Sequence, residues 1–248
     1  MKRTLALLSM LLPLGAAQAI TYGVTDGNRH PHVGALVAEY SDGVYAYCSG
    51  TLISPTVFLT AAHCDIGSSR VYVSFASEIN TKATLLPGTY VASPAYSPRQ
   101  NDPQDLAVVI LDRPVRGVTP ARLPSLGQFN QVAKDQQFTA VGYGGQERQI
   151  DAGGPVVEYR DVREYSVSTF SASGPGYLRL SQNNAIDNGG TCYGDSGGPN
   201  FLGAGSSETN IVAGTMITGD AQCVSTNVIQ RLDTEASRQF LGRFVALP

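Results

Sequence analysis

Short apolar stretches alternate with turns of glycine, proline and polar residues over most of the chain. Apolar residues that alternate with polar ones, or continue for a few positions, are typical of β-strands. The stretches are 33–38, 48–53, 57–60, 71–75, 107–111, 137–141, 156–167, 177–180, 211–218 and 228–232, of which 156–167 predicts one or two strands. Short strands without helical periods between them indicate an all-β fold, either barrels or a sandwich.

A helical pattern is found only near the C-terminus, over about 233–246. Asp233 or Thr234 can cap its first turn, and Glu235 complements the helix dipole. One apolar face is formed by Phe240, Leu241, Phe244 and Val245. We expect this face to pack against the strands of the second half of the chain rather than against a partner protein.

Residues 1–19 have the pattern of a secretory signal peptide. Lys2 and Arg3 precede an apolar stretch over 5–14, and Ala17-Gln18-Ala19 forms a small-residue cleavage pattern. The apolar stretch is shorter than the roughly 20 residues that span a bilayer, and a buried N-terminal helix is the alternative. We predict a secreted protein, or a periplasmic one in a Gram-negative source, without a stable membrane anchor.

Length and composition fit one domain or two subdomains. The 248 residues include 27 glycines and 14 prolines, and a proline-containing connection over 114–127 separates two halves. The formal net charge of −3 indicates no basic surface for nucleic acid. Four cysteines fit an oxidising compartment and allow three disulfide pairings. They have no Cys-x-x-Cys spacing, so we expect no metal site and no cofactor.

Segment 190–199, Gly-Thr-Cys-Tyr-Gly-Asp-Ser-Gly-Gly-Pro, has the features that a nucleophilic serine needs. Glycines beside Ser196 leave its hydroxyl accessible and allow a tight turn. The turn can aim the N–H groups of Gly194 and Ser196 at one point, as an oxyanion hole requires. Asp195 is adjacent to the serine, but a carboxylate needs a histidine between it and the hydroxyl in this chemistry.

Two other interpretations fit this segment. Glycine-rich surface turns often contain Asp-Ser-Gly-Gly, and 194–198 also matches the Gly-x-Ser-x-Gly nucleophile elbow. The elbow requires a histidine after the serine. His30, His32 and His63 all precede Ser196, so chain order excludes the elbow.

His63 is the candidate general base, because histidine has an ordinary pKa near neutral pH. A lone histidine is more often a core residue, but here the serine segment and an aspartate favour catalysis. His30 and His32 flank a proline in a loop and are expected at the surface. Asp105 opens an apolar strand and can be buried against His63. Its competitor Asp102 precedes a proline in a polar segment, where aspartate ordinarily forms a turn.

Three motifs follow one another along the chain: Thr60-Ala61-Ala62-His63-Cys64, Asp105 with apolar 106–109, and Gly194-Asp195-Ser196-Gly197-Gly198-Pro199. Together they resemble the trypsin/chymotrypsin-like serine endopeptidases, in the family's order of histidine, aspartate and serine. The resemblance covers nearly everything after residue 20. Gly142-Tyr143-Gly144 is similar to the family's Gly-Trp-Gly, with tyrosine in place of tryptophan.

The resemblance implies a trypsin-like peptidase domain over 20–248. It would contain two Greek-key six-stranded barrels, the first over about 20–120 and the second over about 121–232, with the active site between them and a helix over about 233–246. It also implies the disulfides Cys48–Cys64 and Cys192–Cys223. The first would fix the histidine turn, and the second would brace the serine loop.

The resemblance places the substrate pocket at Gly190, Thr191 and Gly219. Members that cut after arginine or lysine have an aspartate six residues before the serine, where this chain has Gly190. We therefore expect neutral primary specificity, for small or apolar side chains. Asp187 and Asp220 are the other acidic candidates near the pocket, and both are more simply explained as solvated loop residues.

In the resembled family, a freed N-terminus pairs with the aspartate before the serine and orders the oxyanion loop. That aspartate is Asp195 here, and Ile20 directly follows the predicted cleavage site. Thr21 and Tyr22 depart from the family's Ile-Val-Gly-Gly. We expect signal-peptide removal to free the activating ammonium of Ile20, with local hydrogen bonds to Asp195 as the alternative.

The sequence thus predicts a secreted serine endopeptidase that forms an acyl-enzyme, with His63, Asp105 and Ser196 as its triad. Its expected partners are protein or peptide substrates, with a proteinaceous inhibitor as a further candidate and no nucleic acid. The alternative is a catalytically silent relative that uses the same double barrel as a binding module.

Overall fold

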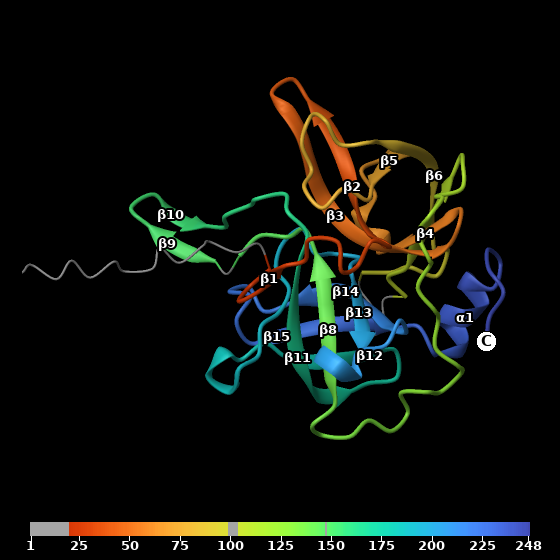
Figure 1. The fold of residues 1–248 in the computed structure, drawn as a ribbon. Coiled ribbons are helices and arrows are strands. Elements are labelled where there is room, and N and C mark those ends of the chain that lie inside the picture. The colour runs from red at the N-terminus through yellow and green to blue at the C-terminus, as the bar shows by residue number, and fades with distance from the viewer. Residues whose placement is uncertain (1–19, 99–103, 147) are drawn as a thin grey trace, which may run out of the picture.

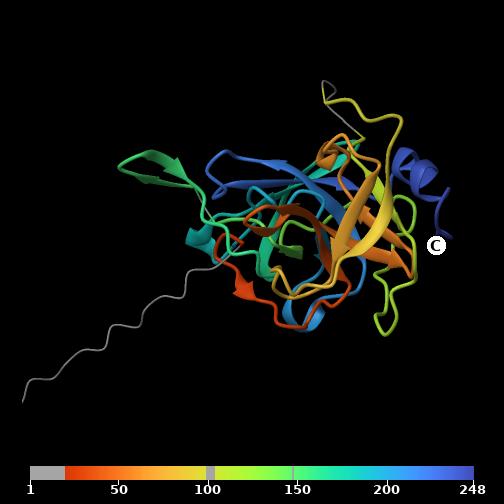
Figure 2. The same cartoon turned by 90° about the horizontal axis from the view of Figure 1, so that it is seen from above.

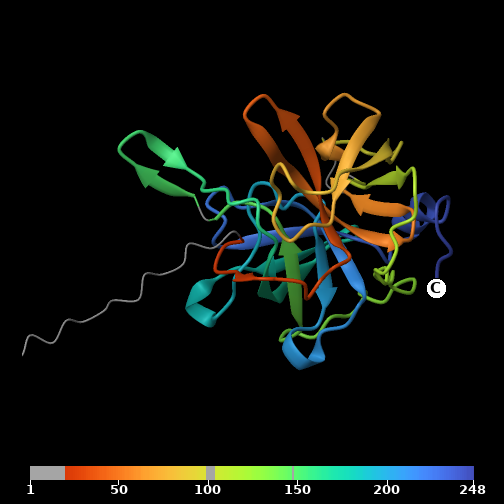
Figure 3. The same ribbon diagram turned by 45° about the horizontal axis from the view of Figure 1, so that its top comes forward.

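The computed structural model describes residues 20–98, 104–146 and 148–248, so the predicted signal peptide and Asp102 lie outside the described residues. Two strand barrels lie side by side, with the helix α1 beside them near the C-terminus (Figure 1). Figure 3 shows the same pair with the first barrel tilted forward. None of the helices in these ranges is long and apolar enough to cross a membrane.

The first barrel is closed by six antiparallel strands in the order β2-β3-β4-β7-β6-β5. They are β2 (Val33–Tyr40), β3 (Gly43–Ser54), β4 (Val57–Thr60), β5 (Arg70–Ser74), β6 (Leu86–Ala92) and β7 (Ala107–Leu111). The apolar pattern predicts all of these except β6, where Pro87 and Gly88 interrupt the strand signal. Gly88 is required by packing, because a Cβ there would lie 2.5 Å from Val109 Cγ1.

The second barrel has the strand order β11-β12-β15-β14-β13-β8 and is closed by pairing of β11 with β8. Its strands are β8 (Gln137–Gly142), β11 (Glu164–Ser173), β12 (Tyr177–Ser181), β13 (Pro199–Leu202), β14 (Val212–Gly219) and β15 (Thr226–Arg231). The short β1 (Val24–Thr25) is added outside this barrel, on β11. The prediction of two six-stranded barrels is confirmed.

The stretch 156–167 is not the continuous strand that its apolar pattern allows. A hairpin of β9 (Gln149–Asp151) and β10 (Gly154–Val156) projects from the body (Figure 2). The chain then follows the first barrel, because Asp161 accepts a hydrogen bond from Ile79 N–H and Arg163 N–H donates to Ser77. Asp161 has a φ of 53°, which interrupts the extended backbone before β11 begins.

The helix α1 (Glu235–Leu241) is shorter than the predicted 233–246. The Thr234 side chain caps it by accepting a hydrogen bond from Ser237 N–H at 3.2 Å. The apolar face packs as predicted, with Phe240 and Leu241 buried. Both belong to a hydrophobic cluster with strand residues of both barrels, so the helix packs on the shared core and not on the second barrel alone.

His30 lies in the interior, and the prediction that it is a surface residue is wrong. Its side chain is bound by Asp26 on one nitrogen and by Glu208 at 2.6 Å on the other. Arg163, which is fully buried, also contacts Asp26, at 2.8 Å. These charges can be buried because each has a partner of opposite sign. They attach the N-terminal segment to the second barrel. His32 is half-buried beside them.

Candidate active site

The turn that carries His63 is held from three sides. It is a short 3₁₀ helix, Ala62–Cys64, directly after β4. The Tyr90 hydroxyl donates to the carbonyls of Ala61 and Ala62, at 2.6 and 3.0 Å. The disulfide Cys48–Cys64 joins the turn to β3. This confirms the expected pairing and fixes the backbone from which the imidazole extends.

Asp105 contacts His63 through both of its carboxylate oxygens. Oδ2 lies 2.7 Å from the imidazole Nδ1, and Oδ1 accepts the backbone N–H of His63 at 2.9 Å. The pairing of β4 with β7 brings them together, since Thr60 is opposite Ala107. Asp105 is buried, whereas the His63 side chain keeps a relative exposure of 30%. One edge of the imidazole is therefore fixed while the residue stays accessible.

Ser196 lies in a loop that packs directly against the histidine turn. Its carbonyl oxygen accepts the N–H of Ser49 at 2.8 Å, and Cys64 Sγ is 3.7 Å from the same oxygen. Gly197 has a φ of +79°, and a Cβ there would lie 2.2 Å from Thr60 Oγ1. Only glycine therefore permits the close approach of this loop to the turn.

The loop leaves two N–H groups available for an oxyanion. Gly194 has a φ of +96°, and its carbonyl accepts the Ser49 hydroxyl at 3.0 Å. That hydroxyl also accepts the N–H of Tyr143 at 3.0 Å. Among hydrogen bonds between described residues, neither the Gly194 nor the Ser196 N–H has an acceptor. This is the state in which the predicted oxyanion hole could receive a ligand oxygen.

Asp195 is fully buried beneath the loop. Its carboxylate accepts the N–H groups of Gly144 and Cys192, at 2.8 and 2.9 Å. A Cβ on Gly142 or Gly144 would lie within 2.4 Å of a carboxylate oxygen, which explains both glycines around Tyr143. Burial raises the pKa of Asp195 to about 7, against the two N–H bonds that lower it. Within the described ranges it forms no ion pair.

Ile20 is also fully buried, at the start of the described chain. Thr21 forms a bridge with Gly190, whose N–H donates to the Thr21 carbonyl at 3.0 Å. The first residues after the predicted cleavage site thus lie against the segment that leads to Asp195 and Ser196. Among the hydrogen bonds and ion pairs of the described residues, none joins Ile20 to Asp195, so their pairing stays a prediction.

The predicted pocket residues lie on two segments that meet at the serine loop. Gly190 and Thr191 precede it, and Gly219 ends β14. Met216 of β14 exchanges backbone hydrogen bonds with Gly197 and Gly198, at 2.7 and 2.9 Å. The disulfide Cys192–Cys223, as expected, joins the two segments again. Thr218 and Gly219 are exposed.

Neither Asp187 nor Asp220 is positioned to provide a negative charge in the predicted substrate pocket. The Asp220 carboxylate accepts four backbone N–H groups of its own turn, those of Gln222, Val224, Ser225 and Thr226. Burial acts to raise the pKa of Asp220, but these hydrogen bonds lower it. Asp187 is exposed at the end of the 3₁₀ helix Asn184–Ile186. Both fit the simpler explanation as loop residues.

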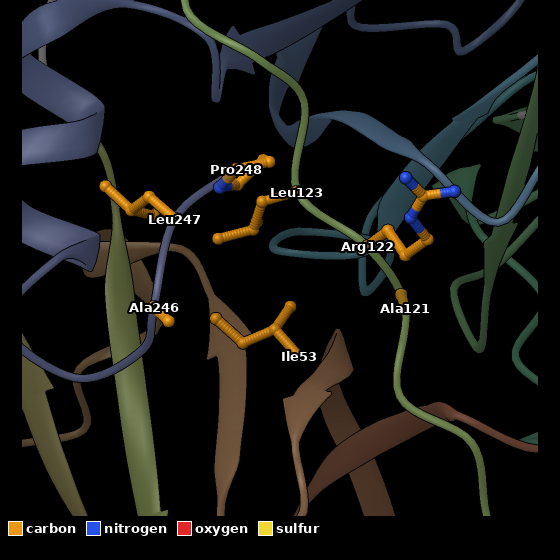
Figure 4. A pocket seen from close by; sticks show the side chains of 7 residues that line it. All are labelled: Ile53, Ala121, Arg122, Leu123, Ala246, Leu247 and Pro248. Carbon is orange, nitrogen blue, oxygen red and sulfur yellow. The ribbon is translucent and has the colours of Figure 1, made fainter.

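Two other features carry no separate chemistry. Cys48, His63 and Cys64 have ligand atoms within 4.8 Å of one another, but both cysteines are used in the disulfide. Figure 4 shows a pocket of about 290 Å³, lined by Ile53, residues 121–123 and the C-terminal residues 246–248. It contains none of the predicted site residues.

Comparison with known proteins agrees with the motifs and the fold. The family model for trypsin matches residues 23–235. The chain belongs to the trypsin family of serine proteases. Snake venom serine protease KN8 of Trimeresurus stejnegeri is 31% identical over 207 residues, covering 77% of this chain and 76% of that protein. A trypsin of Saccharopolyspora erythraea is 29% identical over 181 residues, 68% of this chain and 75% of its own. Ovochymase of Halocynthia roretzi matches over 90 residues, only 6% of its length.

Several site residues of this trypsin-family chain have no signal in the sequence. Ser49 connects Tyr143 with Gly194, and Tyr90 holds the histidine turn. Gln230 Oε1 accepts the N–H of Asp105 at 3.2 Å. Each is an ordinary polar residue in a strand, and its role depends on which strand its own strand pairs with.

Proposed function

We propose that the chain is an active serine endopeptidase with His63, Asp105 and Ser196 as its triad. The observation that carries this is the double contact of Asp105 with His63 next to the serine loop. With Nδ1–H donating to Asp105, the His63 Nε2 is the nitrogen that can accept a proton from Ser196 Oγ.

The reaction follows from these positions. Ser196 Oγ adds to the peptide carbonyl carbon while Nε2 of His63 takes its proton, and the N–H groups of Gly194 and Ser196 bind the resulting oxyanion. The imidazolium then gives its proton to the leaving amine as the C–N bond breaks. Water then adds to the carbonyl carbon of the acyl-enzyme while His63 Nε2 takes one of its protons. The imidazolium gives that proton to Ser196 Oγ as the ester C–O bond breaks and the acid leaves.

We propose neutral primary specificity for this site. Gly190 provides no charge, and Asp220 is occupied by its own turn. A buried guanidinium or ammonium without a partner would be costly. Substrates are peptides or proteins, held along the exposed end of β14 at 217–219.

We further propose that the protein is secreted, with residues 1–19 as its signal peptide, and that the rest of the chain has three parts. The first barrel extends to about 120, the second to about 232, and the helical segment follows. Release of the Ile20 ammonium supplies the cation that the buried Asp195 needs. N-terminal sequencing of the secreted active protein tests this, and a start other than Ile20 contradicts it.

Labelling with an alkyl fluorophosphonate separates the active enzyme from a silent binding module. We expect one label per wild-type molecule on Ser196 and none on Ser196→Ala, with labelling of His63→Ala slowed by several orders of magnitude. Ser206→Ala, in an exposed turn, is the matched control and should label like wild type. A folded wild-type protein that does not label would support the binding module instead.

A further inference from the structure

The place of the side chain that Gly190 lacks is taken by Gln182. Gln182 follows β12 and is fully buried. A Cβ on Gly190 would lie 1.9 Å from Gln182 Oε1. The same oxygen accepts the N–H of Thr191 and lies 3.3 Å from its hydroxyl. The amide of Gln182 therefore stands directly behind the segment that we assign to the substrate pocket.

Asn227 lies beside the other segment of the predicted pocket, the end of β14 that contains Gly219. It is the register partner of Gly219 on one side and of Leu180 on the other. Side chains of paired residues share a face of the sheet, as do residues two positions apart in one strand. Gln182, whose N–H donates to the Ser225 carbonyl, continues the β12–β15 pairing by one position and lies two positions after Leu180. Gln182 and Asn227 therefore face the same side of the second barrel, its interior.

The interior of the second barrel is apolar at one end and polar at the other. At one end Leu178, Leu180 and Ile229 belong to an apolar cluster. At the end that carries Gly190, Gln182 and Asn227 are joined by Asn200, whose Oδ1 accepts Asn227 Nδ2 at 2.9 Å. All three amides are fully buried.

These amides retain hydrogen-bonding capacity. Within the described residues, Gln182 Nε2, Asn200 Nδ2 and Asn227 Oδ1 have no partner. A buried polar atom that makes no hydrogen bond costs about 1–3 kcal/mol. Two of these atoms are donors and one is an acceptor, so a ligand group that both accepts and donates can bond to atoms of both kinds. A methyl group satisfies none of them, an ammonium leaves both donors without an acceptor, and a carboxylate leaves the Asn227 acceptor without a donor.

We propose that Gln182 and Asn227 form the floor of the primary substrate pocket. They select an uncharged side chain that ends in a hydrogen-bonding group, a carboxamide or a hydroxyl. This rests on the proposed function for the position of the pocket, and it replaces the expected apolar preference with a polar neutral one. It also predicts that Gly190→Asp is a poor way to introduce charge, because its Cβ would collide with Gln182.

Matched peptide substrates test the proposal, glutamine against methionine and tyrosine against phenylalanine at the residue before the scissile bond. We expect the hydrogen-bonding member of at least one pair to have a kcat/KM at least about 10-fold higher, corresponding to about 1.4 kcal/mol. The better pair tells whether a carboxamide or a phenol reaches the floor. Ratios near one for both pairs, or a preference for arginine or lysine, would overturn the proposal.

Two variants of Gln182 test whether this residue causes the difference in kcat/KM between the paired substrates. Gln182→Met should reduce the ratio of the preferred pair to near one. Gln182→Glu keeps the acceptor for Thr191 N–H and should raise kcat/KM for lysine relative to glutamine at least about 10-fold, since it supplies a carboxylate. Gln131→Met, in an exposed loop, is the control and should leave both ratios unchanged. Ratios that do not respond to either Gln182 variant would also overturn the proposal.

Binding measurements distinguish this proposal from the proposed function. The same peptide pairs are titrated calorimetrically into Ser196→Ala, where no hydrolysis occurs. A tighter dissociation constant for the hydrogen-bonding member supports the floor even if fluorophosphonate labelling of wild type fails. Equal dissociation constants in a protein that labels normally would remove the floor and keep the triad.

Discussion

Asp105 binds His63 at two points, and the two bonds have different roles. The bond to the backbone N–H positions the turn, whereas the bond to Nδ1 fixes the ring and its tautomer. The carboxamide of an asparagine could keep the first and alter the second. Substitution at this residue therefore separates placement of the ring from its protonation.

Asp105→Asn should lower kcat by about 10⁴-fold without unfolding the protein, because the ring would adopt the wrong tautomer for accepting the serine proton. The measurement is kcat on a peptide substrate, with circular dichroism to check the fold. Asp102→Asn is the matched control and should retain near wild-type kcat. A crippled Asp102→Asn beside a harmless Asp105→Asn would transfer the orienting role to Asp102.

At the scale of elements, the N-terminal segment is attached to the second barrel by a buried charge cluster. His30 lies between Asp26 and Glu208, with Arg163 on Asp26 and Arg29 on Glu208. Burial acts to lower the pKa of His30, but its bonds to the two carboxylates raise it above the ordinary value. Burial lowers the pKa of the neighbouring His32 to about 4. His30 therefore keeps its proton to a higher pH than His32 does.

His30→Gln should destabilise the protein more at pH 6 than at pH 9. A raised histidine pKa stabilises the fold fully below the unfolded value of 6.5, and this is lost as pH rises through the folded pKa. Asp26 and Glu208, whose pKa values are lowered, stay ionised over this range. Urea unfolding at both pH values gives the difference. His32→Gln is the comparison with the opposite sign: the folded pKa of His32 is lowered to about 4, so removing it should cost less at pH 6 than at pH 9. An equal loss for His30→Gln at both pH values would contradict the assignment.

Sequence patterns predict the strands, the helix and the triad more completely than the residues that support the active site from neighbouring strands. His63, Asp105 and Ser196 each lie in a local motif, and the disulfides follow from the family resemblance. Ser49, Gln182 and Asn227 are ordinary polar residues whose roles depend on contacts between strands far apart in the chain. His30 illustrates the same limit: Asp26 lies only four residues before it, but its second partner, Glu208, lies 178 residues after it.

At the scale of the whole molecule, the segment that begins at Ile20 lies against the segment that leads to the serine loop. Ile20 is buried, Thr21 pairs with Gly190, and Asp195 lies under the loop that ends at Ser196. While Ile20 is joined to the residue before it, it has no ammonium to offer. In that form burial raises the pKa of Asp195 to about 7, with the charge of Glu164 acting in the same direction. We therefore predict that cleavage before Ile20 stabilises the ionised form of Asp195.

A chain extended by one alanine before Ile20 should lose stability relative to the chain that starts at Ile20 as pH rises from about 4 to about 7. A carboxyl whose folded pKa is raised binds its proton more tightly when folded, so stability falls as pH passes from the unfolded to the folded pKa. The shift corresponds to a few kcal/mol at most. Urea unfolding at pH 5 and pH 8 measures it, with Ser196→Ala in both chains to prevent self-digestion. Asp195→Asn is the control, because it removes the titrating group and should make both chains respond to pH alike. Identical pH profiles for the two Asp195 chains would mean that the freed N-terminus does not reach this carboxylate.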